Sequence, residues 1–409
     1  ALPLSIALAL ASGVGPEAGI FTAIVAGFVI SALGGSSVQI AGPTAAFATI
    51  VAGIVAHDGM DGLIVATILA GIFLILMGLC HFGSLIKFIP FTITTGFTSG
   101  IAVTIVIGQL KDFFGLTYPT GVKPIETVEK FEAVIHHFST MNMDAVIVGV
   151  VSLVILIIAP YIFKRIPGSL LAVIAGILMV QFLPLKVNTI GNLYTISNAL
   201  PSLHFPSLSL NVIQNALPNA LTIAVLAAIE SLLSCVVADG MINGKHRSDM
   251  ELVAQGAGNI ASALFGGIPA TGAIARTAAN IKNGGRTPIA GMVHSITLVI
   301  VLVVLMPYAG MIPMPTIAAI LFIVAYNMCQ WCTFVNLVKT APKSDIIVLV
   351  TSFVLTVIFD LVVAIEVGMV LACLLFIKRM SEETKVNGWT YVDAVSYTHL
   401  RAHETPEHL

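Results

Sequence analysis

Two charged side chains lie inside hydrophobic segments, where they are the clearest candidates for chemistry. Arg276 lies in the segment PATGAIARTAAN, and Glu230 lies in VLAAIESLLSC. Ionisable residues are expensive inside a bilayer and usually serve a substrate or an ion. An arginine can hold an oxyanion through two parallel hydrogen bonds. Glu230 and Ser234 are spaced i, i+4 and share one helix face, which suits a proton or a cation.

A structural role for the same residues is the alternative, because Glu230 and Arg276 could simply pair with one another or with backbone groups. Enzymatic chemistry is not indicated, since the sequence offers no nucleophile–base pair, metal cluster or phosphate loop. Cys329 and Cys332 form a C-x-x-C, but no second pair completes a zinc site. We therefore expect no metal and no cofactor.

Two glycine–proline breaks interrupt the hydrophobic segments, GPTAA at 42–46 and GIPATG at 267–272. A helix that begins inside the membrane presents free N–H groups and the positive end of its dipole. If two such starts, near Thr44 and Thr271, face each other, an anion between them would relieve their repulsion. Paired, interrupted segments are a pointer to a transporter site. Proline kinks with only a packing role are the alternative.

Hydrophobic segments must position these breaks, and they fill the chain. Of 409 residues, 57% are hydrophobic and 9% charged, against about 25% charged residues in a soluble domain. Lipid is therefore the expected solvent, and nucleic acid is not an expected partner. We predict fourteen segments, near 1–13, 17–33, 44–56, 61–80, 89–110, 143–162, 168–185, 212–237, 249–264, 270–281, 286–306, 315–331, 344–359 and 361–377. Residues 111–142 include an amphipathic stretch that we expect on the surface.

The order and charge of the segments predict a topology. The breaks fall in the third and tenth segments, seven apart, so two seven-helix halves would run in opposite directions. Alternate loops carry eleven and four Lys or Arg residues, and the positive-inside rule then places both chain ends in the cytoplasm. The first segment is shorter than the roughly 20 residues of a span, so we interpret it as the second half of an incomplete helix.

The carboxy-terminal segment differs from the rest of the chain. Residues 396–409 read SYTHLRAHETPEHL and are polar, without hydrophobic periodicity. They resemble translated sequencing-adapter sequence, so we interpret them as non-native.

Long motifs in the chain resemble the sulfate permease (SulP) family. They are ALPLSIALALASGVGPEAGIFTAIVAG, GGSSVQIAGPTAAF, GFTSGIAVTIVIGQLKDFFGL, AIESLLSCVVADGM and GGIPATGAIARTAANIKNGGRTPIAG. The resemblance covers about residues 1–388. That family includes bicarbonate, sulfate and dicarboxylate carriers, and the motor protein prestin.

The resemblance implies an all-α fold of two inverted seven-helix repeats, shared with uracil permeases. Helices 1–4 and 8–11, at 1–86 and 211–310, would form a core domain that slides as an elevator. Helices 5–7 and 12–14, at 87–210 and 311–380, would form the gate domain. A cytoplasmic tail follows at 381–409. Family members are dimers, and most carry a STAS domain after the last helix; the similarity ends soon after Glu383, so we expect none here.

The resemblance also implies an anion site on helices 1, 3 and 10, made by Ser5, Thr44, Ala45, Ala275 and Arg276. Glu230 takes the place of an acidic residue that couples cations in some members, and Ser234 matches a hydroxyl one turn later. Glutamate in place of aspartate favours protons over sodium.

These observations predict secondary active transport of a small anion across the cell (inner) membrane. Sulfate, bicarbonate and C4-dicarboxylates all suit two helix ends and an arginine, and a proton or sodium would be the co-substrate. A homodimer in the lipid bilayer is the expected assembly. A passive anion channel, an exchanger or a voltage-driven motor on the same scaffold are the alternatives.

Overall fold

The protein is helical throughout most of the part described here. The computed structural model describes residues 2–84, 91–119, 124, 126–162, 167–194, 200–203, 206, 210–329, 331–358, 367–368, 370–375 and 377. Within these residues, seven helices are long and apolar enough to cross a membrane. The prediction of an all-α membrane protein is confirmed. Of the predicted segment 361–377, the structure describes residues 367–368, 370–375 and 377, and the tail 381–409 lies entirely outside the described residues.

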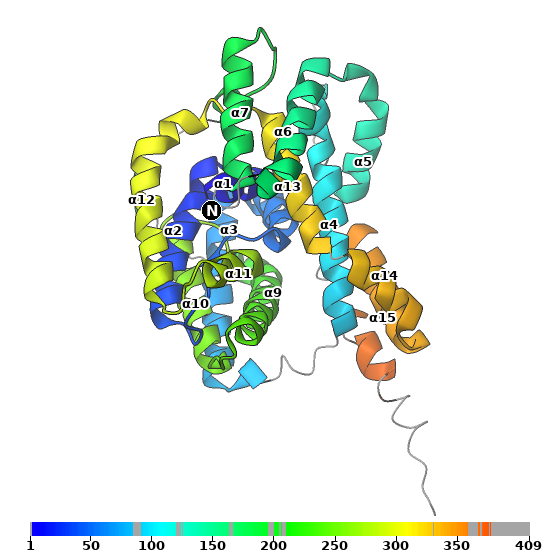
Figure 1. The fold of residues 1–409 in the computed structure, drawn as a ribbon. Helices are drawn as coiled ribbons and strands as arrows, with labels where there is room; N and C mark the ends of the chain where they lie inside the picture. The colour runs from blue at the N-terminus through cyan, green and yellow to red at the C-terminus, as the bar shows by residue number, and fades with distance from the viewer. Residues whose placement is uncertain are drawn as a thin grey trace, which may run out of the picture.

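The helices pack as two groups (Figure 1). The first consists of α1 (Leu2–Ala11), α2 (Pro16–Leu33), α3 (Ala46–Leu79), α9 (Leu210–Ile242), α10 (Ser248–Leu264), α11 (Ile274–Lys282) and α12 (Ile289–Ala309). The second consists of α4 (Phe91–Phe114), α5 (Thr127–His136), α6 (Met143–Ile162), α7 (Gly168–Phe182), α13 (Met314–Cys329), α14 (Trp331–Thr340) and α15 (Lys343–Ile358). We call them the first and second helix groups. A single turn, α8 (Ile190–Leu193), follows α7.

Each group is built around one or two central helices. In the first group α3 packs against α9 and α10, and α2 packs against α10 and α12. In the second group α4 packs against α13 and α15, while α6 packs against α7 and α13. The groups meet chiefly where α1 contacts α13 and where α3 contacts α4. A surface between two internally packed bodies is a common place for a binding site.

Two short strands connect the breaks that the sequence shows. Strand β1 (Ala41–Gly42) pairs antiparallel with β2 (Thr271–Gly272), with Ala41 opposite Gly272 and Gly42 opposite Thr271. Residues this small let the two backbones approach side chains closely: a Cβ at Gly42 would collide with Nη1 of Arg276, and one at Gly272 with the amide of Gln39. The pairing fixes the starts of α3 and α11 against each other.

The two helices that lead into the strands, α2 and α10, run in opposite directions. The backbone N–H groups of Gly35 and Ser36, just after α2, donate to Glu251 in the first turn of α10. In the reverse sense, the N–H of Ile268, just after α10, donates to Thr22 near the start of α2, over 2.7 Å. Helices α2 and α10 are therefore antiparallel, and each leads into a strand and a further helix.

Helix boundaries agree with the prediction at one break and differ from it at another. The predicted segments 44–56 and 61–80 form the two halves of α3, which meet at a kink at Gly59, whose φ of 72° lies in the left-handed region that glycine tolerates. The predicted segment 315–331 ends earlier, at Cys329, and α14 follows as a separate helix. Helix α14 carries Lys339 and Thr340 beside its apolar residues, so hydropathy alone did not reveal it.

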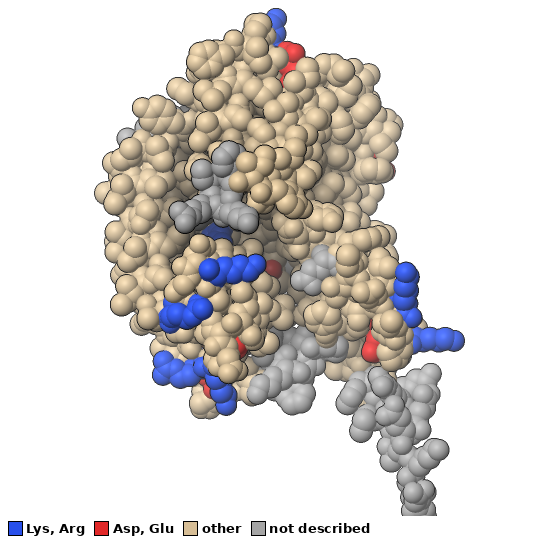
Figure 2. Space-filling view, viewed as in Figure 1, with Lys and Arg blue, Asp and Glu red and all other residues tan. Residues whose placement is uncertain are grey.

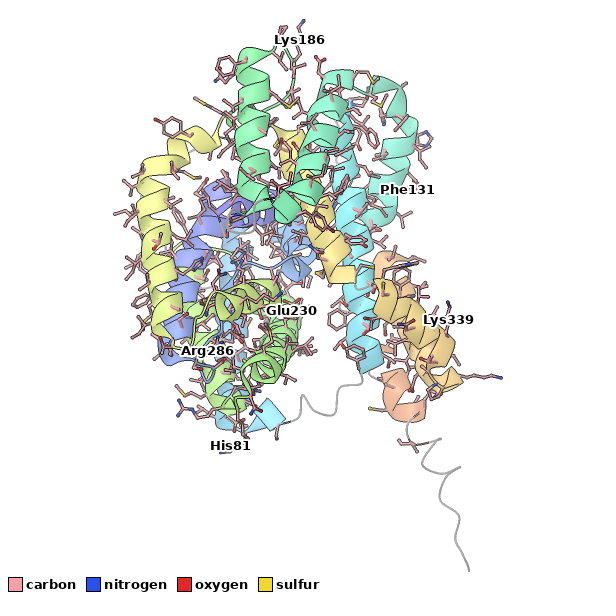
Figure 3. All side chains as sticks on the ribbon, viewed as in Figure 1. His81, Phe131, Lys186, Glu230, Arg286 and Lys339 are labelled. Carbon is pink, nitrogen blue, oxygen red and sulfur yellow. The ribbon has the colours of Figure 1, made fainter. Side chains whose placement is uncertain are left out.

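Two surface features concern the predicted amphipathic stretch and the predicted asymmetry of Lys and Arg residues. The amphipathic stretch within 111–142 forms α5, whose Phe131 and Ile135 are exposed (Figure 3). Lys and Arg side chains gather in the lower half of the molecule in Figure 2. Figure 3 places Arg286 and Lys339 there and Lys186 at the opposite end. On the face that Figure 2 shows, cationic side chains thus lie mostly toward one end of the bundle.

Candidate functional site

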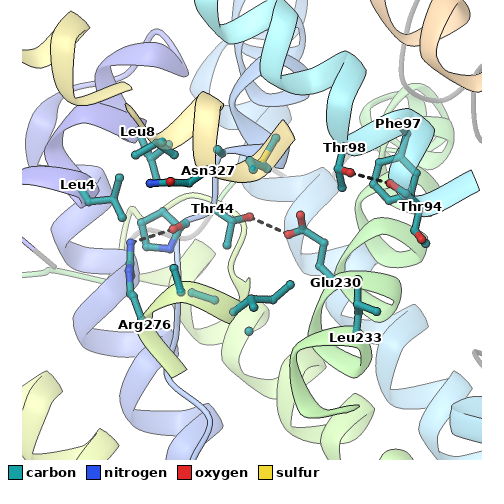
Figure 4. A pocket seen from close by; sticks show the side chains of 18 of the residues that line it. Leu4, Leu8, Thr44, Thr94, Phe97, Thr98, Glu230, Leu233, Arg276 and Asn327 are labelled. Carbon is teal, nitrogen blue, oxygen red and sulfur yellow. Dashed lines mark hydrogen bonds between the residues drawn. The ribbon is translucent and has the colours of Figure 1, made fainter. Parts of the chain in front are cut away.

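A cavity of about 290 Å³ lies where the two helix groups meet (Figure 4). Most of its wall is apolar, and Arg276 and Glu230 are its charged residues in the part of the chain that the structure describes. The first group contributes Leu4, Leu8, Pro43, Thr44, Ala45, Glu230, Leu233, Gly272, Ala273, Ile274, Ala275 and Arg276. The second contributes Phe91, Thr94, Thr95, Phe97, Thr98, Val324, Asn327 and Met328. An apolar pocket with a few convergent polar groups is typical of a small-molecule site.

Glu230 projects from α9 toward the start of α3. The hydroxyl of Thr44 donates a hydrogen bond to Oε2 of Glu230 over 2.9 Å. Thr44 lies two residues before the first residue of α3, so this bond joins the interrupted segment to α9. The carboxyl group is therefore at the cavity and beside one of the two helix starts.

Arg276 lies in the first turn of α11 and is incompletely bonded. Its Nη2 donates to the carbonyl of Pro43 over 3.0 Å, while Nε and Nη1 are buried without a hydrogen-bond partner. Buried donors without an acceptor are costly, and native proteins rarely leave them so. An oxyanion would supply acceptors for a guanidinium group in this state.

The alternative in which Arg276 and Glu230 pair with each other is not what the structure shows. Both line the cavity, yet among the described residues no ion pair joins them; each bonds to a different part of the Pro43–Thr44 segment. The second form of that alternative, a bond to backbone, does occur at Arg276. That bond uses one of the three guanidinium nitrogens and leaves two unpartnered.

Both helix starts lie at the cavity, but α11 begins later than predicted. Helix α3 begins at Ala46 and α11 at Ile274, and neither has an acidic side chain in its first turn. Thr271 belongs to β2, is fully buried, and donates to the carbonyl of Ala227 over 3.2 Å. Strand pairing uses residues 271–272, so Thr271 does not line the cavity, whereas Ala273, Ile274 and Ala275 do.

The structure separates the other predicted site residues into two sets. Thr44, Ala45, Ala275, Arg276 and Glu230 line one cavity. Ser5 and Ser234 lie behind its wall: both are fully buried, neither hydroxyl has a partner, and the cavity is lined instead by Leu4 and Leu8 on α1 and by Leu233 on α9. Their roles in binding and coupling stay predictions.

Sequence reasoning missed the side of the cavity that the second helix group supplies. Thr94 and Thr98 lie one turn apart on α4, and Thr98 donates to the carbonyl of Thr94 over 2.8 Å. Asn327 on α13 reaches the cavity near Leu8 (Figure 4). The i, i+4 spacing of threonines in FTITTGFTSG was a usable signal, because it places two hydroxyls on one helix face.

A buried carboxylate, that of Glu251, stabilises the segment that leads to the site. Glu251 is fully buried and accepts four hydrogen bonds, from the N–H groups of Gly35 and Ser36 and from the side-chain amides of Gln39 and Gln255. The distances run from 2.9 to 3.2 Å. Because the bonded segment leads directly into β1, Glu251 fixes the approach to Pro43 and Thr44.

Solved structures share this architecture. The transmembrane domain of a cyanobacterium bicarbonate transporter, BicA, is 30% identical, with a TM-score of 0.80 over 89% of this chain and 93% of that one. The murine anion transporter Slc26a9 in an inward-facing state has a TM-score of 0.82 at 19% identity, over 92% of this chain and 66% of the other. The second match shows the fold alone. The fold is thus that of a multi-pass membrane anion transporter.

Sequence comparison gives the family. The "Sulfate permease family" model matches residues 1–352, and the chain belongs to that family. A Bacillus subtilis protein, "Putative sulfate transporter YvdB", is 43% identical over 393 residues, 95% of this chain and 73% of the relative. "Bicarbonate transporter BicA" of Picosynechococcus sp. is 32% identical over 405 residues, 96% and 71%. These relatives are transporters and not enzymes, as the sequence predicted.

Proposed function

We propose that the protein is a secondary active transporter that binds one small anion between Arg276 and the starts of α3 and α11. The observation that carries this proposal is the incomplete bonding of Arg276 beside a cavity with two unneutralised helix starts. Sulfate and bicarbonate are the substrate candidates that the names of the relatives suggest. A C4-dicarboxylate also suits the chemistry.

The two helix groups would be the moving parts. We assign residues 1–86 and 211–310 to a core domain that carries Thr44, Glu230 and Arg276, and residues 87–210 and 311–380 to a gate domain. The antiparallel relation of α2 and α10 supports inverted repeats. Because the cavity lies between the groups, sliding of the core along the gate would move the anion as an elevator does.

Charge balance links the anion's valence to Glu230. Each helix start contributes about half a positive charge and Arg276 one, so the site carries roughly +2 when Glu230 is neutral and roughly +1 when it is ionised. A divalent anion is therefore balanced by a protonated Glu230, and a monovalent anion by an ionised Glu230. Proton coupling would follow for sulfate, with sodium as the competing co-substrate.

Orientation and assembly are proposed from the surface. The end of the bundle rich in Lys and Arg, which includes Arg286 and Lys339, would face the cytoplasm of a cell (inner) membrane. Both chain ends would then be cytoplasmic. A homodimer in the lipid bilayer remains our expectation.

Uptake into proteoliposomes tests this function. Labelled sulfate or bicarbonate should accumulate above its equilibrium level when an inward proton or sodium gradient is imposed, and should stop doing so when an ionophore collapses that gradient. Accumulation that never exceeds equilibrium would favour the alternative of a passive channel. Uptake that requires an anion inside the vesicle, with no need for a cation gradient, would favour an exchanger. No transport of any tested anion would contradict the proposal.

A further inference from the structure

The hydroxyl group of Thr44 has one hydrogen, and in this structure it donates that hydrogen in a hydrogen bond to Glu230. A hydroxyl group donates one hydrogen bond, whereas an ionised carboxylate can only accept. While Glu230 is ionised, Thr44 therefore donates to Oε2 over 2.9 Å. The oxygen of Thr44 can then present only lone pairs to an anion in the cavity, which is repulsive.

Protonation of Glu230 changes what Thr44 can do. A neutral carboxyl group carries an O–H donor, and its hydrogen-bond partner in the structure is the oxygen of Thr44. We propose that Thr44 is the coupling relay of this transporter: when Glu230 gains a proton the Thr44–Glu230 hydrogen bond reverses, and the freed hydroxyl hydrogen of Thr44 donates to the bound anion. The proton that Glu230 takes up stays on Glu230, and no covalent bond to the anion is broken or formed. The inference rests on the proposed anion site and deepens it.

The position of Thr44 fits a relay. The residue before it, Pro43, accepts the hydrogen bond from Arg276, so Thr44 lies between the guanidinium and carboxyl groups, as Figure 4 shows. An anion bound to Arg276 would therefore be next to Thr44. The residue also immediately precedes Ala45 and the start of α3, whose free N–H groups attract the same anion.

Few other charges bear on Glu230. Arg276 of α11 is the other charged residue among the described residues lining the cavity, and α1, α4 and α13 contribute no titratable side chain there. On α3, Asp58 contacts Asn219, three turns from Glu230 along α9. On α10, Glu251 is held by the segment after α2. The direct partner of the carboxyl group is therefore Thr44.

The test is the pH profile of anion affinity. Binding of sulfate to the purified chain would be measured by calorimetry in sodium-free buffer from acidic to alkaline pH, for wild type, Thr44→Val, Thr44→Ser and Arg276→Ala. Thr98→Val is the matched control, because Thr98 lines the same cavity but donates within its own helix. Thr44→Ala replaces the valine variant if that one does not fold.

The relay predicts an effect that depends on pH. Thr44→Val should weaken sulfate binding about ten- to a hundredfold at acidic pH, the cost of one hydrogen bond to a charged group, and should leave it unchanged at alkaline pH. Thr44→Ser should show the same dependence of sulfate affinity on pH as wild type. Thr98→Val should also keep the shape of that pH dependence. Equal weakening by Thr44→Val at every pH would overturn the relay. Undiminished binding by Arg276→Ala would overturn the proposed site itself, so the two failures are distinguishable.

Discussion

Replacing Glu251 by glutamine tests whether the site is held in place by a buried negative charge. The carboxylate accepts two hydrogen bonds on each oxygen, from Gly35 and Ser36 on Oε2 and from Gln39 and Gln255 on Oε1. Glutamine offers one accepting oxygen, so it can serve only one of these two pairs. Two hydrogen bonds to a charged group, worth about 1.5–3 kcal/mol each, are lost.

Two effects reduce that cost. The side chain of Gln255 has an unpartnered oxygen, so rotation of its amide can accept from the new NH₂ group. A neutral glutamine is also cheaper to bury than a carboxylate. We therefore expect Glu251→Gln to lower the free energy of unfolding by roughly 2–4 kcal/mol, and to weaken anion binding because the segment before β1 loosens.

Thermal unfolding in detergent and sulfate affinity measure the two effects together. Asp249→Asn is the control on the same helix, since Asp249 is partly exposed and its contacts with His81 and Gly83 lie at the surface; such contacts are worth about 0–1 kcal/mol. A Glu251→Gln protein that melts and binds sulfate like wild type would refute the claim that this carboxylate positions β1.

Three further predictions concern the cavity. Arg276→Lys keeps the charge but loses the planar fork, so sulfate affinity measured by calorimetry should fall about tenfold, and Arg276→Ala should cost about ten- to a hundredfold; equal affinity for all three proteins would contradict the assignment. Gly42→Ala places a methyl group against Nη1 of Arg276 at a φ of +157° that disfavours any side chain, so it should weaken binding and lower stability, whereas Gly53→Ala, with open space around it, should do neither. Glu230→Gln should retain anion exchange in proteoliposomes but lose accumulation driven by an inward proton gradient; full accumulation would show that Glu230 is not the coupling group.

Much of the fold follows from local sequence, because hydrophobic runs and glycine–proline breaks act over a few residues. The paired breaks predicted that segments about 230 positions apart meet, and the β1–β2 pairing confirms this. Arg276 and Glu230 were found because a charge within an apolar run is conspicuous. The threonine spacing on α4 is a weaker signal than a charge in an apolar run, so the contribution of α4 and α13 to the cavity was missed.

Details set by tertiary packing could not be read from one sequence. Thr271 was predicted to lie near a helix start. It pairs with β1 instead, so α11 begins at Ile274. Ser5 was expected at the cavity, yet the rotation of α1 presents Leu4 and Leu8 instead. Glu251 lies in the first turn of α10, and only the packing of the segment after α2 shows what it binds.

The proposed function requires one anion to bind between Arg276 and the start of α3. The most direct measurement is a structure of the purified chain with selenate, a sulfate analogue whose selenium can be located by anomalous scattering. We expect selenate in the cavity of Figure 4, with its oxygens within hydrogen-bond distance of the Arg276 guanidinium group and the Thr44 hydroxyl. Selenate bound elsewhere, with this cavity empty and the two guanidinium nitrogens still unpartnered, would contradict it.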